Sequence, residues 1–135
     1  MQNNIESVLT AYYAAFNAGD MEAFLDLMTD DVQHDINQSR RQLGKPAFAA
    51  FMKEMNRCYR DKITDLVVLA DASGTRAAAE YVVHGEYLMA GPGMPPAHGQ
   101  KYELQVGAFF TLRDGKISRV TIYYNLADWL AQVSK

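Results

Sequence analysis

The sequence predicts an α+β domain in which one face of a curved antiparallel β-sheet packs against helices. Up to about Arg60 the apolar residues recur with the 3.6-residue period of amphipathic helices, and from Ile63 onward they recur with the two-residue period of strands. Asp114-Gly115 then joins two strand-like runs and is a strong signal for a two-residue hairpin. Helices followed by consecutive hairpins are the element order of an α+β fold.

Length and composition indicate one globular domain over residues 1–135. The chain has 49% hydrophobic residues and a net charge of −3, and its Lys and Arg residues form no basic stripe, so we expect no nucleic-acid partner. No apolar run approaches the ~20 residues needed to cross a bilayer, and the first residues lack the features of a signal peptide. We therefore expect a cytoplasmic protein with no membrane partner.

The sequence carries no signal for a metal or a cofactor. Its single cysteine, Cys58, cannot form an internal disulfide and lies in a helical apolar pattern, where it acts as core filler. No Cys/His cluster has the spacing of zinc ligands, and there is no phosphate loop or dinucleotide fingerprint. We expect neither a metal nor a cofactor.

Three helices are predicted before the sheet. The first runs from about Asn4 to Ala18, the second from Met21 to Met28, and the third from near Pro46 through Arg60. Apolar stripes on the first and third are candidates for the wall of a cavity, because a broad face rich in Met and Phe suits a cavity as well as a packed core. The candidate residues on these stripes are Tyr12, Phe16, Phe51, Met52 and Met55.

The predicted sheet has one short opening strand and four long ones. The strands expected from the period and the turn signals are residues 31–37, 63–70, 75–89, 100–113 and 116–125. Residues 38–44 and the Pro- and Gly-rich residues 90–99 are expected to be loops, and a last helix covers Leu126 to Val133.

The alternation along the strands predicts which side chains face the helices. The inward set is almost wholly apolar along residues 102–112, and it includes Phe110. In the same phase Tyr81, Tyr87 and Tyr124 point inward and are candidates for lining a cavity. The outward set carries Phe109 and Tyr123, and aromatics scattered over an outer face predict a homodimer that packs there.

The opening strand is unusual because it carries polar side chains where a small domain normally places apolar ones. We interpret it as the rim or floor of a pocket. A carboxylate such as Asp35 that faces an apolar cavity has its pKa raised toward the range of a general base, whereas a solvated Asp is the ordinary alternative. His34 should then point to the opposite face unless a bulge lets both contribute, and Asn37 shares the face of Asp35 and could orient a carbonyl.

Three stretches resemble the ketosteroid isomerase/SnoaL-like branch of the NTF2-like superfamily. They are Tyr12 to Asp20 with its Asn17-Ala18-Gly19-Asp20 link, Met28 to Val32, and Arg113 to Ile117, and the element order matches along nearly the whole chain. The resemblance implies a cone-shaped fold in which a curved sheet wraps over the N-terminal helices around an apolar cavity. It also implies that Asp35 is the catalytic base on the opening strand and that Tyr12 is an oxyanion donor, while Ala108 occupies the position of the second oxyanion acid.

From these residues we expect a cofactor-independent enzyme of the isomerase or cyclase type. A small apolar carbonyl compound would enter the cavity, Asp35 would remove an acidic proton, and Tyr12 with Asn37 or His34 would stabilise the enolate oxygen. One alternative is a lyase, dehydratase or hydrolase in which Asp35 and His34 activate water or a hydroxyl. Another is a non-catalytic dimeric module that binds a small ligand, because function depends on the site and not on the fold.

Overall fold

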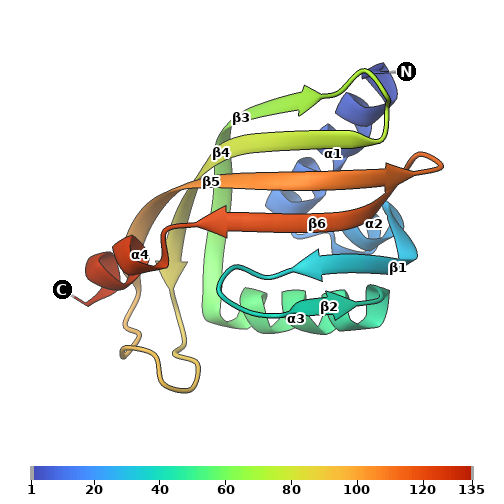
Figure 1. Ribbon diagram of the computed structural model, residues 1–135. Helices are drawn as coiled ribbons and strands as arrows, with labels where there is room; N and C mark the ends of the chain where they lie inside the picture. Colours follow the sequence, from blue (N-terminus) through green and yellow to red (C-terminus); the bar gives the residue numbers. More distant parts are fainter. Residues whose placement is uncertain (1, 135) are drawn as a thin grey trace.

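The computed structural model describes residues 2–134 and shows a curved, open sheet with helices against one face (Figure 1). Residues 1 and 135 of the domain expected over 1–135 lie outside the described part. The elements in chain order are α1 (Gln2–Ala18), α2 (Met21–Asp26), β1 (Met28–Asp35), β2 (Arg41–Leu43), α3 (Lys45–Cys58), β3 (Tyr59–Ala70), β4 (Arg76–Tyr87), β5 (Gln100–Arg113), β6 (Lys116–Tyr124) and α4 (Leu126–Val133).

The sheet confirms the α+β fold and corrects the prediction that all of its strands are antiparallel. Its order is β2-β1-β6-β5-β4-β3, and four of the five neighbouring pairs are antiparallel. β1 and β6 are parallel, since the chain leaves β1 through β2 and α3 and returns to its side only with its last strand. A helix and several strands lie between the two in the sequence, and parallel neighbours need such a crossover.

Two strands begin earlier than expected and one was missed. β1 starts at Met28, and β3 starts at Tyr59, directly after α3, where the last turn was expected to remain helical. Tyr59 has extended backbone angles, and its N–H still caps the carbonyl of Met55. The missed strand is β2, which covers three residues of the predicted loop 38–44. Pairing with β1 stabilises this strand, and its sequence has no alternation of apolar and polar residues that could have predicted it.

A bulge divides β3 into two segments with opposite side-chain phase. The register with β4 shifts between Thr64 and Val67, and Asp65 in the gap has a positive φ of 56°. A bulge adds one residue and bends the strand. As a result Ile63 points to the helices before the bulge, while Val68 does so after it and Val67 turns outward.

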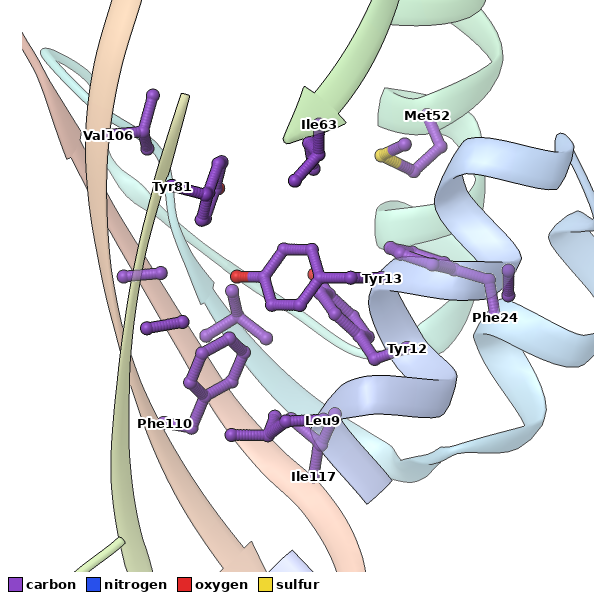
Figure 2. Close-up of a cluster of buried hydrophobic side chains, with 14 of the residues drawn as sticks. Leu9, Tyr12, Tyr13, Phe24, Met52, Ile63, Tyr81, Val106, Phe110 and Ile117 are labelled. Atoms are coloured by element: carbon purple, nitrogen blue, oxygen red, sulfur yellow. The ribbon is translucent and has the colours of Figure 1, made fainter. Parts of the chain in front are cut away.

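The core lies between the sheet and the first three helices (Figure 2). Tyr12 stacks on Phe24 with ring centroids 4.4 Å apart, and the edge of its ring meets Phe110. Tyr13 reaches from α1 toward Tyr81 on β4. The inward set predicted along residues 102–112 of β5 is buried throughout, which confirms its phase.

The opposite face of the sheet carries solvent-exposed aromatic side chains. Phe109 is 45% exposed and Tyr123 is 58% exposed, and their rings contact each other edge to face with centroids 5.9 Å apart. They lie on neighbouring strands, β5 and β6, on the face away from the helices. None of the helices within residues 2–134 is both long and apolar enough to span a membrane.

Candidate active site

A cavity of about 210 Å³ lies between the inner face of the sheet and the helices. Its walls are mostly aromatic and aliphatic, and no Lys or Arg belongs to the lining among residues 2–134. The polar or titratable members of the lining are Tyr12, Tyr13, His34, Asn37, Asn56, Tyr59, Asp61, Tyr81, Tyr102 and Tyr124.

Most of the predicted site residues line this cavity. They come from α1, α3, β1, β4, β6 and the turn after β1, and the structure brings them around one space: Tyr12, Phe16, His34, Asn37, Phe51, Met52, Met55, Tyr81 and Tyr124. Tyr12 forms part of the deep wall, where burial raises its pKa well above the ordinary value. A neutral hydroxyl is therefore what it presents.

Tyr87 and Phe110 point inward as predicted but do not line the cavity. Tyr87 is fully buried near the loop 88–99, where its hydroxyl donates a hydrogen bond to the carbonyl of Pro95 at 2.6 Å. Phe110 is packed between β5 and the tyrosines of α1. Both have the right phase on their strands, but the cavity does not extend to their positions along those strands.

Asp35 does not face the cavity, which corrects the prediction for this residue. Val32 and His34 take the inward phase of β1, so Asp35 lies on the outer face, where 25% of its side chain is exposed. Arg41 donates from Nε at 2.5 Å and from Nη2 at 3.0 Å, and the hydroxyl of Thr121 donates at 2.6 Å. These bonds to the ionised form outweigh desolvation and lower the pKa of Asp35 to about 2, whereas a raised pKa was expected.

His34 is the member of the predicted pair that lies inside. It is 2% exposed, its ring stacks on Phe48 with centroids 4.0 Å apart, and the edge of Phe51 meets it at 4.8 Å. Burial lowers its pKa to about 4, although Asp35 and Gln42 act in the opposite direction. His34 is therefore a neutral imidazole at neutral pH, and the regular strand separates it from Asp35 as a period of two requires.

The carboxyl inside the cavity is Asp61, which the sequence analysis did not single out. It lies opposite Gly85 on β4, and Gly85 lies opposite Tyr102 on β5, so the three form one row across three strands. The hydroxyl of Tyr102 donates a hydrogen bond to Oδ1 of Asp61 across the glycine. A Cβ at position 85 would come within 3.0 Å of both partners, so only glycine leaves the space that this bond occupies.

The surroundings of Asp61 are apolar and rich in tyrosine. Burial raises the pKa of Asp61 to about 6, and the bond from Tyr102 offsets only part of that rise. The carboxyl in turn raises the pKa values of nearby tyrosines, including Tyr59, which reaches about 12 mainly through burial, and Tyr124. At neutral pH the site combines an ionised carboxylate of raised basicity with protonated phenols, which is the composition of a general-base site.

Asp61 also borders a wide polar groove on the outside of the molecule. Residues lining both the cavity and this groove are Phe16, Asn56, Tyr59, Asp61 and Tyr102. The carboxyl therefore lies at the boundary between an apolar interior and solvent. This position gives a proton on Asp61 a route to water.

The sequence does contain a signal for Asp61. From Tyr59 to Thr64, uncharged rings and aliphatics alternate with charged or polar residues, except that Asp61 takes an apolar position between Tyr59 and Ile63. A carboxyl in the inward phase of a strand is a candidate functional group. The signal was missed because a helix was predicted through Arg60, which removed the first residues of the strand from the pattern.

The described residues hold no evident metal centre. Among residues 2–134, no group of three or more His, Cys, Asp or Glu side chains lies close enough together to bind an ion.

Known protein families and structures agree with this architecture. The family model described as a SnoaL-like domain matches residues 9–120. A search of curated proteins finds no match.

Three crystal structures of bacterial proteins, each described as a proposed polyketide cyclase, are similar to the chain over almost its whole length. The protein from Pseudomonas putida is 61% identical with a TM-score of 0.92, covering 93% of this chain and 95% of its own. The protein from Xanthomonas campestris is 52% identical with a TM-score of 0.95, covering 98% of both chains. The protein from a Silicibacter species is 47% identical with a TM-score of 0.95, covering 98% of this chain and 96% of its own.

Proposed function

The chain belongs to the SnoaL-like domain family of the NTF2-like proteins, and from this premise we propose that it is a cofactor-independent isomerase or cyclase. Its substrate is a small apolar carbonyl compound that binds in the cavity and loses a proton to Asp61. The observation that carries the proposal is the carboxyl of Asp61, which lies among tyrosines in an apolar cavity with its pKa raised to about 6. The similarity to proposed polyketide cyclases supports the same reaction class.

The proposed reaction begins with proton transfer from a carbon next to the carbonyl group to the carboxylate of Asp61. The electron pair of the broken C–H bond moves to the carbonyl oxygen and forms an enolate. Tyr59 and Tyr124 line the same cavity, keep their protons at neutral pH, and are the donors that would stabilise this oxygen. Isomerisation of a β,γ-unsaturated substrate ends when Asp61 returns the proton to the γ-carbon of the dienolate and the C=C bond becomes conjugated with the carbonyl. Cyclisation ends when the enolate carbon attacks a second carbonyl carbon and Asp61 returns the proton to the alkoxide that forms.

Tyr102 acts in this scheme on the base and not on the substrate. Its hydroxyl binds Oδ1 of Asp61, and among residues 2–134 no hydrogen bond is donated to Oδ2. The bond fixes the orientation of the carboxyl and leaves one oxygen for the substrate proton. Positioning of this kind is a recognised contribution to catalysis.

The test is hydrogen–deuterium exchange of 2-tetralone, a small apolar ketone whose C1 protons are acidic, followed by proton NMR in D₂O. Asp61→Asn should lower the exchange rate by about 10²–10⁴-fold, the usual contribution of a general base. Asp35→Asn is the matched control and should change the rate by less than about threefold, because its carboxyl lies outside the cavity. Wild-type exchange no faster than buffer, or equal losses in both variants, would remove Asp61 as the base.

A second candidate function is addition or removal of water on the same scaffold. It is favoured by the groove that borders Asp61, because the carboxylate could activate a water molecule that enters there. Binding of 2-tetralone without exchange, together with hydration or dehydration that depends on Asp61, would support this alternative. Binding without any Asp61-dependent reaction would support a non-catalytic binding module.

A further inference from the structure

A second polar contact point lies in the cavity, on the same face of the sheet as Asp61 but several strands away from it. Asp61 belongs to the edge strand β3 and His34 belongs to β1, and β4, β5 and β6 lie between them. Both residues line the same cavity because the sheet curves around the helices (Figure 1). A ligand that fills the cavity therefore meets a polar group at each side.

The imidazole of His34 is held in one orientation. Phe48 lies parallel to the ring with an interplanar angle of 8°, and Phe51 closes its edge at 80°. Nδ1 of this ring is fully buried and has no hydrogen-bond partner among residues 2–134, although Gln42 is the register partner of His34 on β2. A neutral imidazole keeps one of its two nitrogens as an acceptor, and His34 lines the cavity, so this acceptor is available to a ligand.

Asn37 adds a donor close to the same wall. Its Oδ1 accepts the backbone N–H of Tyr124 at 3.3 Å, and its Nδ2 is buried without a partner among residues 2–134. A buried polar group without a partner destabilises the unliganded protein, and a ligand oxygen that accepts its N–H relieves this cost. His34 and Asn37 thus present an acceptor nitrogen and an N–H donor, the pair that a hydroxyl group matches.

We propose that His34 and Asn37 bind a second oxygen of the substrate, so that the substrate is a neutral, flat ring compound with two oxygen functions. One is the carbonyl next to the acidic C–H bond at Asp61, and the other is a hydroxyl at the far end of the ring system. Absence of Lys and Arg from the described lining disfavours an anion, and the aromatic walls favour a flat ligand. The proposal rests on the proposed function, which supplies the role of Asp61.

The experiment compares 6-hydroxy-2-tetralone with 6-methyl-2-tetralone, two ligands of similar shape, in wild type and in His34→Phe. Trp129 is the only tryptophan and lines the cavity, so its fluorescence reports occupancy directly. In wild type the hydroxy compound should bind at least as tightly as the methyl compound. In His34→Phe, which keeps an aromatic ring on Phe48, the ratio of the two dissociation constants should shift by about 10-fold against the hydroxy compound.

Two further variants separate the possible outcomes. Asn37→Ala should shift the same ratio in the same direction by a smaller factor, and His34→Gln should recover part of it because the amide restores an acceptor. A ratio that stays within twofold in His34→Phe and Asn37→Ala, or failure of both ligands to bind wild type, would overturn the proposal. In Asp61→Asn the ratio of the two dissociation constants should stay as in wild type, while deuterium exchange is lost. The binding ratio therefore tests the contact at His34 and Asn37, and the exchange rate separately tests Asp61 as the base.

Discussion

Two carboxyl groups on opposite faces of the same sheet have opposite properties. Asp35 lies on the outer face of β1, accepts hydrogen bonds from Arg41 and Thr121, and has a pKa of about 2. Asp61 lies on the inner face of β3, accepts one side-chain bond from Tyr102, and has a pKa of about 6. The same functional group is thus a permanent anion in one place and a titrating base in the other.

The difference shows how strongly the neighbours of a carboxyl determine its chemistry. A guanidinium in contact stabilises the charged form, while an apolar cavity penalises it. Arg119 extends the outer network by donating to Thr121 at 2.6 Å and to Thr111 at 2.9 Å. The outer face around Asp35 therefore carries a polar network, whereas the inner face around Asp61 is an apolar cavity with a carboxyl of raised pKa.

The largest expected effect concerns association through the outer face, which we propose forms a homodimer interface. Glutamates in place of both Phe109 and Tyr123 should raise the dimer dissociation constant by at least about 100-fold, because charge replaces the apolar centre of the contact. Sedimentation equilibrium measures this change. Thr10→Glu, which adds a charge to the exposed side of α1, should leave the oligomeric state unchanged, and a wild-type monomer would refute the interface.

The next largest effect is expected at Gly85, which lies between Asp61 and Tyr102 on the inner face of the sheet. Gly85→Ala places a methyl group within 3.0 Å of Tyr102 and Asp61, which should destabilise the fold by about 1–3 kcal/mol and lower the exchange of 2-tetralone at least tenfold. Urea unfolding and NMR measure the two quantities. Gly107→Ala is the matched control on β5, where a Cβ meets nothing within 4 Å; similar effects in both variants would contradict the role of Gly85.

Asp61→Asn should stabilise the protein at neutral pH while it removes activity. The pKa of Asp61 is about 6 in the folded state against an ordinary value of 3.8, so the folded form binds its proton more tightly and stability falls as pH rises from about 4 to 6. Above pH 6 the buried carboxyl is ionised and lowers the folding stability by its full amount. The Asn side chain carries no charge, so the free energy of unfolding at pH 7 should rise by about 1–3 kcal/mol. Thermal unfolding at pH 7 and pH 4 measures it, and an equal difference at both would exclude this titration.

Asp35→Asn should have the smallest effect and the opposite sign. The pKa of Asp35 is about 2 in the folded state against 3.8, so its contribution is present above pH 4 and disappears as pH falls through about 2. Because Arg41 is 46% exposed, solvent screening limits the cost of the substitution at pH 7 to about 1 kcal/mol. A urea titration at pH 7 checks this value, and a stabilised Asp35→Asn variant would show that the outer pair is not favourable.

Much of the fold could be predicted because it follows from local periodicity. The helical stripe with Tyr12, the alternation through Phe110 and the hairpin at Asp114-Gly115 each depend on residues a few positions apart, and the structure reproduces all three. The phase of β5 could be assigned for the same reason. Resemblance to the SnoaL-like family then predicted a cavity, and the stripes and strand phases predicted part of its lining.

The site itself was decided by tertiary structure. Side chains alternate on any strand, but which phase is inward depends on the packing of β1 against α3, and this put His34 inside and Asp35 outside. The bond between Asp61 and Tyr102 joins residues 41 positions apart, across a glycine on a third strand. By itself the sequence determined the elements and the apolar face of the sheet, because these depend on the order of neighbours along the chain. Only the folded chain could decide which carboxyl loses its water, because desolvation depends on groups brought together from distant parts of the sequence.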